Sequence, residues 1–227
     1  MAVVPRPWPA SGERRGQIQP AKSSVVAELP RRMYSDRVGL RVIEERPEAL
    51  PEYGKMPIAF EVRSRLRIEP VRRGLGGLSF VEEEIDPYVK DYDAIEGEGP
   101  ASWPERFDLS RWGILSAFEG KRRVGGAVVA WNTVGVDRLR ARDDLAVLWD
   151  LRVRPENRGS GIGPLLFDHL VSWARERGCE WLEAETQNIN VPACRFYVRR
   201  GCKLGAVDAH AYEGMPDEVQ LLWWRNL

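Results

Sequence analysis

Apolar and charged residues alternate within residues 56–68, where Ile58, Phe60 and Val62 stand at every second position. A period of two is typical of a strand that buries one face and exposes the other to water. We therefore expect the first strand of the sheet in this stretch.

Strand-forming residues also fill two runs on either side of the turn Glu119-Gly120-Lys121. The runs at residues 111–118 and 124–132 predict the two strands of a β-hairpin. A further apolar run at residues 145–153 predicts a strand that follows this hairpin.

Helical spacing begins after that strand. The residues that recur three or four positions apart are Leu165, Leu166, His169, Leu170, Trp173 and Ala174, and Gly178 follows them. This spacing places them on one face of a helix, and glycine is common just beyond a helix end. A helix is therefore predicted directly after a glycine-rich turn.

Further elements are predicted towards the C-terminus. Residues 181–186 predict a strand, and Pro192 stands at the start of a helix that Gly201 ends. The runs at residues 204–212 and 219–224 predict a closing hairpin.

The predicted order is strand, hairpin, strand, helix, strand, helix and hairpin. This order indicates a mixed α/β sheet flanked by helices, in a single domain over residues 31–227 with an N-terminal extension to about residue 55. Residues 1–30 contain five prolines among polar and basic residues. Such a composition predicts a disordered tail.

The charge balance argues against two classes of partner. Lys and Arg number 34, as do Asp and Glu, so no overall field draws the chain to nucleic acid or to an anionic membrane. No apolar run reaches the roughly 18 residues of a membrane span. Cys179, Cys194 and Cys202 are odd in number and do not combine with histidines at metal-ligand spacing. We therefore expect no metal and a reducing, cytoplasmic location.

The most distinctive chemistry lies at residues 158–163, Arg-Gly-Ser-Gly-Ile-Gly, between a predicted strand and a predicted helix. Glycine allows a positive φ and the close approach of a ligand, so that backbone N–H groups converge on an anion at the helix start. A pyrophosphate is expected there. The dinucleotide fingerprint requires another glycine spacing, and the nucleotide P-loop requires Lys-Ser/Thr where this chain has Pro164-Leu165.

With its pattern Arg-x-x-Gly-x-Gly, this turn resembles the acyl-CoA loop of the GCN5-related N-acetyltransferase (GNAT) superfamily. The next block of that superfamily is similar to residues 185–197, in which Asn190 is followed by Ala193 and Tyr197. The residues of this block are also similar to those of the streptothricin acetyltransferase branch. Residues 87–92, 205–208 and 223–224 also resemble that branch, so that the resemblance covers roughly residues 56–227.

The resemblance implies a GNAT-like fold with a mostly antiparallel sheet, whose strands splay apart at a slot for acetyl-CoA. It also implies that the end of the strand at residues 145–153 lies beside the pantetheine arm, where a backbone N–H stabilises the developing oxyanion. The residues expected to bind the cofactor are Leu151, Arg152, Val153, Arg158, Gly159, Ser160, Gly161, Ile162, Gly163, Asn190, Ala193 and Tyr197.

Acetyl transfer to an amine requires a neutral nucleophile and a proton for the departing thiolate. An ammonium group with a pKa of about 10 must first lose a proton. Glu185 is the first candidate base, because the resemblance places acids of this role five residues before Asn190; Asp150 is the second candidate and water the third. Tyr197 is the candidate general acid. Alternatively, Glu185 only pairs with a basic neighbour and Tyr197 only packs in the core, while Asn190 suits a helix cap.

The acidic and aromatic segment at residues 78–98 forms either a lid or a solvated loop. Tyr88, Asp91 and Tyr92 in this segment, with Asp150 and Glu185, are expected to bind the substrate. The expected acceptor is a primary amine of a small molecule, and the resemblance points to a streptothricin-type antibiotic. The alternatives are a protein N-terminal or lysine acetyltransferase and a non-catalytic CoA-binding module. A homodimer is compatible with the resemblance.

Overall fold

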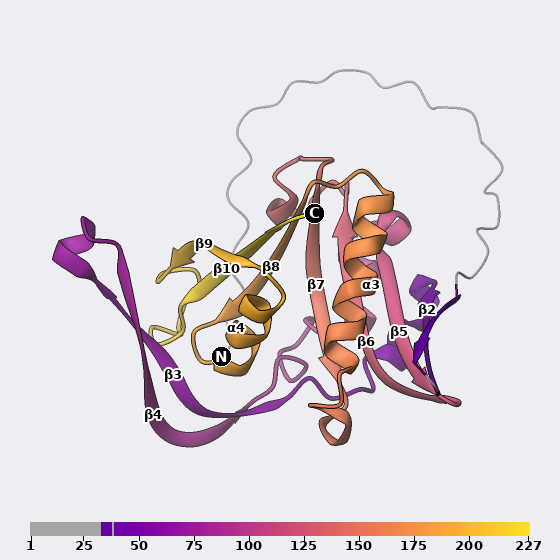
Figure 1. The fold of residues 1–227 in the computed structure, drawn as a ribbon, viewed down its shortest axis with the longest axis horizontal. Coiled ribbons are helices and arrows are strands. Elements are labelled where there is room, and N and C mark those ends of the chain that lie inside the picture. The colour runs from indigo at the N-terminus through magenta and orange to yellow at the C-terminus, as the bar shows by residue number, and fades with distance from the viewer. Residues whose placement is uncertain (1–32, 38) are drawn as a thin grey trace.

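The computed structural model describes residues 33–37 and 39–227 (Figure 1). The tail predicted over residues 1–30 lies outside this part of the chain. An eight-stranded sheet has the order β1-β2-β5-β6-β7-β8-β10-β9, and β3 and β4 form a separate two-stranded sheet. The strands are β1 (Met33–Arg37), β2 (Leu40–Glu45), β3 (Phe60–Pro70), β4 (Leu78–Lys90), β5 (Gly113–Glu119), β6 (Arg122–Trp131), β7 (Leu145–Val153), β8 (Trp181–Gln187), β9 (Lys203–Asp208) and β10 (Gln220–Asn226).

Two of the α-helices are long enough to cover the sheet, and the others are single turns. The α-helices are α1 (Leu50–Tyr53), α2 (Trp103–Arg106), α3 (Ile162–Glu176) and α4 (Val191–Arg199), and the 3-10 helices are η1 (Pro47–Ala49), η2 (Val71–Gly74), η3 (Pro100–Ser102), η4 (Leu109–Arg111), η5 (Asp137–Leu139) and η6 (Pro155–Asn157). None of the helices in the described part of the chain combines the length and apolarity that crossing a membrane requires.

Most of the elements predicted from the residue pattern are confirmed. β5 and β6 form the predicted hairpin, β7 has the predicted bounds, and β9 and β10 form the closing hairpin. α3 begins at the glycine-rich turn, and α4 begins one residue before Pro192. Neighbouring strands of the main sheet are antiparallel except β7 and β8. The predicted mixed, mostly antiparallel sheet is therefore confirmed.

The prediction that the strand at residues 56–68 is the first of the sheet was wrong. β1 and β2 precede it, in the region predicted as an N-terminal extension, and β2 pairs with β5 in the main sheet. The predicted strand is β3, which pairs with β4 in a hairpin of its own. Period-two alternation identifies a strand, but it does not specify which sheet the strand joins.

The acidic segment at residues 78–98 also differs from the predicted loop, because its first thirteen residues form β4. Glu83 forms two ion pairs with residues of β3, with Arg65 at 2.7 Å and with Arg67 at 3.0 Å. Opposite charges on facing strands stabilise such a pair of strands. The basic partner lies on the other strand, so the composition of the segment alone does not reveal it.

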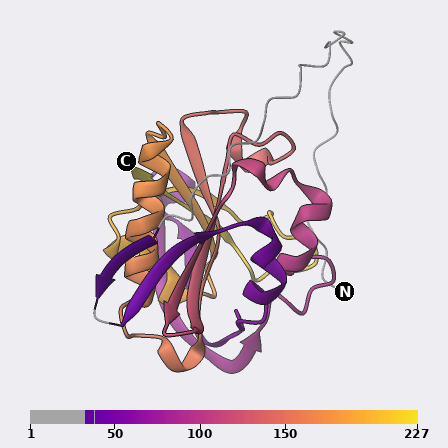
Figure 2. The ribbon, with the colours of Figure 1, turned by 90° about the vertical axis from the view of Figure 1, so that its right-hand side faces the viewer.

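The apolar residues of the main sheet form two layers, because successive side chains of a strand point to opposite faces. On β7, Ala146 and Leu148 pack in the layer with α3, whereas Leu145 and Val147 pack in the layer with α1 and α2. Figure 2 shows α3 on one side of the sheet and the short N-terminal helices on the other.

β7 and β8 are parallel neighbours that pair over only four positions. Their register runs from Leu145 opposite Trp181 to Leu148 opposite Ala184 and ends there. Beyond this point the two strands no longer pair with each other. The turns into α3 and α4 both follow these carboxyl ends, so the starts of the two helices lie at the same end of the sheet.

A bulge lies where the two strands part. Val129 of β6 is opposite Leu148 and Val128 is opposite Asp150, so Trp149 is an extra residue in β7. A bulge bends the strand and changes the direction of its side chains. Trp149 and Asp150 therefore both face the layer that contains α1, although they are adjacent in the chain.

Candidate active site

The glycine-rich turn presents backbone N–H groups at the start of α3. Gly159 and Gly161 have φ of 79° and 90°, a conformation that side chains rarely allow. Gly161 is the N-cap residue of α3, and no side chain caps the helix. The first amides of a helix lack intrahelical acceptors and carry partial positive charge. This geometry suits an anion, and the pyrophosphate expected at the turn stays a prediction.

Two polar side chains of the turn stabilise its shape. The Arg158 guanidinium donates to the carbonyl oxygen of Val153 at 3.1 Å and to that of Ala59 at 2.8 Å. Partial burial lowers the pKa of Arg158. The Ser160 hydroxyl donates to the carbonyl oxygen of Asn157 at 2.6 Å. These contacts tie the turn to β7 and to the segment before β3, and the cofactor contacts expected of both residues stay predictions.

The end of β7 alternates between two environments. Leu151 and Val153 pack against the layer of α3, whereas the Arg152 side chain lies on the opposite face and is almost fully buried. Its guanidinium donates to Asp150 Oδ2 at 2.6 Å, to Asp93 Oδ2 at 2.7 Å and to the carbonyl oxygen of Met56 at 2.9 Å. This side chain faces away from α3, so only the backbone of Arg152 lies at the gap between β7 and β8.

Asp150, the second candidate base, is also enclosed. Its Oδ1 accepts hydrogen bonds from the Tyr53 hydroxyl at 2.5 Å and from Arg152 Nε at 2.9 Å. Its side chain is 4% exposed. Burial and the neighbouring Asp150 raise the pKa of Tyr53 well above its ordinary value. Both carboxylate oxygens of Asp150 thus accept hydrogen bonds, and its side chain is less exposed than that of Glu185, which is 20% exposed.

Glu185 lies on β8 beyond the last pair with β7, and its side chain is 20% exposed. The Tyr212 hydroxyl donates to its Oε1 at 2.6 Å, and Arg138 lies 3.4 Å from its Oε2. Gln187 donates to Tyr212 at 2.8 Å and accepts from Tyr92. Burial raises the pKa of Tyr92 and of Tyr212. Glu185 therefore does pair with a basic neighbour, and it remains accessible at the same time.

Arg138 was not identified from the sequence. It lies in η5, donates to Oε1 of the fully buried Glu183 at 3.1 Å and contacts Glu185. Arg140 also donates to Glu183, at 2.7 Å. Within the described part of the chain, Nη2 of Arg138 is buried without a hydrogen-bond partner. The sequence signal was the pair of arginines at 138 and 140, but only the sheet register places them beside β8.

Tyr197 lies on α4 and is 6% exposed. Its ring packs against those of Phe167, Phe196 and Trp223. Burial raises its pKa, although the charge of Arg138 acts in the opposite direction. Its hydroxyl has no hydrogen-bond partner among the described residues. The predicted core packing is therefore present, and a free phenolic donor accompanies it.

Asn190 caps α4, as the sequence predicted. Its side-chain oxygen accepts a hydrogen bond from the backbone N–H of Ala193 at 3.2 Å. A cap of this kind satisfies one of the free donors at a helix start. The cofactor contacts of Asn190 and Ala193 stay predictions.

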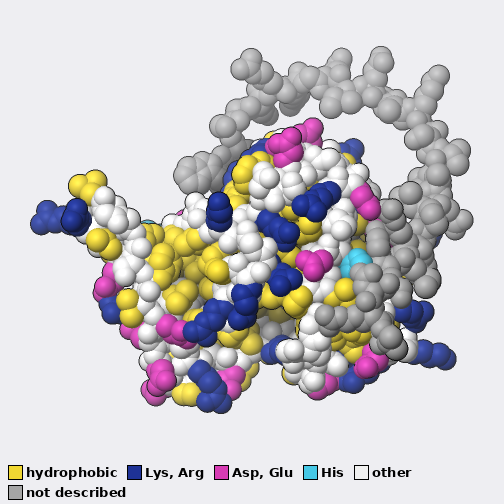
Figure 3. Space-filling view, in the orientation of Figure 1, with side chains coloured by type: hydrophobic (Ala, Val, Ile, Leu, Met, Phe, Trp, Pro, Cys, Tyr) yellow, Lys and Arg dark blue, Asp and Glu magenta, His cyan; other side chains and the backbone are white. Residues whose placement is uncertain are grey.

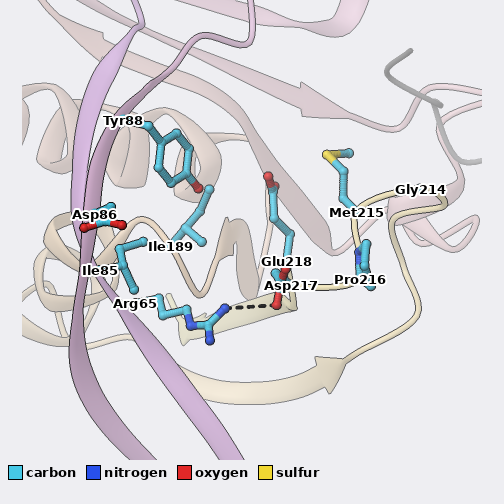
Figure 4. Close-up of a pocket in the computed structure, with 10 residues that line it drawn as sticks. All are labelled: Arg65, Ile85, Asp86, Tyr88, Ile189, Gly214, Met215, Pro216, Asp217 and Glu218. Carbon is cyan, nitrogen blue, oxygen red and sulfur yellow. Dashed lines mark hydrogen bonds and ion pairs between the residues drawn. The ribbon is translucent and has the colours of Figure 1, made fainter.

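A pocket of about 510 Å³ opens between the β3–β4 hairpin and the loop at residues 209–219. Figure 4 shows Tyr88 and Glu218 pointing into the same space from these two segments. Its lining comprises Arg65, Ile85, Asp86, Tyr88, Ile189, Gly214, Met215, Pro216, Asp217 and Glu218. Of the predicted substrate residues, Tyr88 lines it, whereas Asp91, Tyr92, Asp150 and Glu185 do not.

A series of contacts connects this pocket with Glu185. Lys90 lies 2.5 Å from Glu218 and 5.5 Å from the centre of the Tyr92 ring. Tyr92 donates to Gln187, and Gln187 in turn contacts the tyrosine that binds Glu185. Asp91 has a local role, because its Oδ1 accepts from the backbone N–H of Asp93 at 3.1 Å.

A model of the Acetyltransferase (GNAT) family matches residues 79–202. Streptothricin acetyltransferase A of Bacillus subtilis (strain 168) is 32% identical over 96 residues, which are 41% of this chain and 56% of that protein. Streptothricin acetyltransferase of Streptomyces lavendulae is 41% identical over 69 residues, which are 30% of this chain and 36% of that protein. The chain thus spans about half the length, or less, of these relatives.

A solved structure supports the same likeness over most of the chain. It is that of a protein assigned as a streptothricin acetyltransferase from Bacillus anthracis strain Ames, in complex with acetyl coenzyme A. It is similar with a TM-score of 0.66 and 25% identity, over 84% of this chain and 99% of that one.

We expect Asp150→Asn to lower the free energy of unfolding by about 3 kcal/mol, because the buried Arg152 loses one of its two carboxylate partners. Urea unfolding followed by tryptophan fluorescence measures this change. The matched control is Asp143→Asn, an exposed position at which we expect a change within about 0.5 kcal/mol. Equal stability of the two variants would contradict the structural role of Asp150.

Proposed function

The chain belongs to the GNAT acetyltransferase family, and we propose that it transfers an acetyl group from acetyl-CoA to a primary amine of a small, cationic molecule. The observation that carries this proposal is the position of the gap between β7 and β8. The uncapped start of α3 lies at this gap on one side of the sheet. Glu185 lies on β8 beyond the last pair with β7, and hydrogen bonds through Tyr212 and Gln187 connect it with Tyr92 near the pocket.

The residues at the gap fit the cofactor. The left-handed glycines and free amides of residues 159–163 suit the pyrophosphate of the cofactor. The unpaired edge of Leu151–Val153 offers backbone groups to its extended pantetheine chain. Asn190 and Ala193 lie at the start of the neighbouring helix α4. When bound, acetyl-CoA supplies a thioester whose carbonyl carbon is open to attack by an amine.

Glu185 accepts a proton from the acceptor ammonium, directly or through water, so that the nitrogen gains a free electron pair. The nitrogen then forms the new C–N bond as the C–S bond breaks. Tyr197 donates its phenolic proton to the leaving sulfur and regains a proton, through water, from the nitrogen, which loses its second proton as the amide forms. The raised pKa of Tyr197 keeps this proton in place at pH values where an ordinary tyrosine begins to ionise. A backbone N–H of Leu151–Val153 stabilises the developing negative charge on oxygen.

The acceptor pocket favours a small cationic amine. Asp86 and Glu218 place carboxylates in its lining, and Tyr88 adds an aromatic face that suits an ammonium group. Its volume of about 510 Å³ lies within the range of small-molecule sites. Because the relatives named above are streptothricin acetyltransferases, a streptothricin-type antibiotic is the proposed acceptor.

Thiol release from acetyl-CoA by the purified protein tests this function. We expect rapid release with streptothricin and slower release with aminoglycosides, polyamines or peptides, because the relatives named above are streptothricin acetyltransferases. Release with another amine would retain the chemistry and replace the acceptor. Binding of CoA without release for any amine would contradict the enzymatic proposal and favour a CoA-binding module.

Tyr197→Phe removes the proposed proton donor and keeps the ring that packs in the core. We expect kcat to fall about 100-fold, since a positioned acid contributes about 10² to 10⁴ in rate, while the dissociation constant of CoA changes little. In the wild-type protein this group should cause no decline in kcat between about pH 8 and 9.5, because its pKa lies above the ordinary value of about 10. Steady-state kinetics and calorimetry of CoA binding check both points. Unchanged kcat would exclude Tyr197 as the acid.

Glu185→Gln removes the proposed base and retains a side chain that accepts a hydrogen bond from Tyr212. We expect the acidic limb of the pH–rate profile to flatten and the rate near neutral pH to fall about 100-fold. Glu105→Gln is the matched control, because Glu105 is exposed on α2 and should leave the profile unchanged. An acidic limb that survives in Glu185→Gln would assign the proton transfer to Asp150 or to water.

A further inference from the structure

Two arginines of the segment between β6 and β7 pair with one buried carboxylate. Arg138 donates to Glu183 at 3.1 Å and Arg140 donates to it at 2.7 Å, and the Glu183 side chain has no exposure to solvent. A buried carboxylate requires a compensating charge, and Arg140 already supplies one. The second arginine is therefore more than the charge of Glu183 alone requires.

The Arg138 guanidinium is shared between two acids of β8. Its Nε donates to Oε1 of Glu183, whereas its Nη1 lies 3.4 Å from Oε2 of Glu185. The third nitrogen, Nη2, is buried and has no hydrogen-bond partner within the described part of the chain. Arginine often binds a single carboxylate through two parallel hydrogen bonds. The position of Arg138 is instead a compromise that serves Glu185 as well as Glu183.

The backbone that follows Arg138 has an uncommon conformation. Arg140 and Ala141 have positive φ, of 51° and 54°, and Arg140 is the C-cap residue of η5, the single turn that carries Arg138. Residues other than glycine adopt this left-handed conformation at a cost in free energy, and such residues gather at functional sites. The strain thus lies directly beside the turn that brings Arg138 to β8.

Many other cations of the protein are surrounded by water. Figure 3 shows Lys and Arg side chains at the surface of the face that carries α3 and α4. Exposed charges of this kind are screened and have little effect on their neighbours. The Arg138 side chain is only 23% exposed, and charges interact more strongly where less water screens them. Arg138 therefore acts on its acidic neighbours more strongly than a surface cation does.

We propose that Arg138 is a positioning residue of the acetyl transfer, because it fixes the carboxylate of Glu185. The Tyr212 hydroxyl holds Oε1 of this carboxylate at 2.6 Å. Arg138 attracts Oε2 from 3.4 Å, which is longer than a good hydrogen bond. Two groups from different segments thus orient the carboxylate, and Oε2 keeps a lone pair for a proton. This role rests on the proposed function, in which Glu185 accepts the proton of the acceptor.

The charge of Arg138 also reaches Tyr197. It acts to lower the pKa of the phenol, against the larger effect of burial, which raises that pKa. A cation near the phenol stabilises the phenolate that remains when the proton passes to the leaving sulfur. Arg138 therefore lies within electrostatic reach of both groups that exchange protons in the proposed reaction.

Arg138→Met and Arg140→Met separate this role from a structural one. Each variant removes one of the two arginines that pair with Glu183, so we expect the urea midpoint of unfolding to fall to a similar extent in both. With acetyl-CoA and the best acceptor of the panel above, kcat should fall at least about 10-fold for Arg138→Met and less than about 2-fold for Arg140→Met. The dissociation constant of CoA, measured by calorimetry, should stay within about 3-fold of the wild-type value in both.

The conservative variant and a double variant complete the test. Arg138→Lys keeps the charge and should hold kcat within about 5-fold of the wild type. In the Glu185→Gln background, Arg138→Met should lower kcat by no more than about 3-fold further, because residues that act as a unit do not have additive effects.

Two results would overturn the positioning role and leave the proposed function intact. One is an equal loss of kcat in Arg138→Met and Arg140→Met, and the other is full additivity of Arg138→Met with Glu185→Gln. A wild type that releases no thiol with any amine of the panel would instead contradict the proposed function, and the positioning role with it.

Discussion

The separation of β7 from β8 is the constraint on which the rest of the site depends. Two parallel strands that pair over four positions and then part leave backbone groups that are costly to bury without another partner. The bulge at Trp149 accompanies this separation and directs Asp150 towards the layer of α1. One gap in the ladder thus provides backbone donors, the starts of two helices and a carboxylate of β8 at a single place.

Buried charge holds the segments around this gap in one arrangement. Arg152 lies between the carboxylates of Asp150 and Asp93, and Arg138 lies between those of Glu183 and Glu185. Each guanidinium compensates at least one carboxylate of another segment, because an unpaired charge in such a place would be strongly destabilising. Among these carboxylates, Asp150 and Glu183 are almost fully buried, whereas that of Glu185 keeps contact with solvent. The network therefore holds β7 in place and leaves the Glu185 carboxylate partly exposed to solvent.

Much of the candidate site could be predicted because its parts are local. The glycine turn before α3 and the Asn190 cap of α4 depend on a few adjacent residues, and both are present. The resemblance to the GNAT superfamily, near its streptothricin branch, is also confirmed. The partners of Glu185 could not be predicted in this way. Arg138 and Tyr212 lie far from it in the chain, and only the order of strands and loops brings them together.

The sequence by itself determined the types and most of the bounds of the elements, because periodicity, glycine and proline act over a few residues. It also determined which residues form the glycine-rich turn before α3. The tertiary structure decided that β3 joins β4 in a separate hairpin, that Arg152 turns away from the gap and that Asp150 is enclosed. These outcomes depend on the register between strands and on contacts between distant segments. Neither the register nor such contacts appear in any short stretch of the chain.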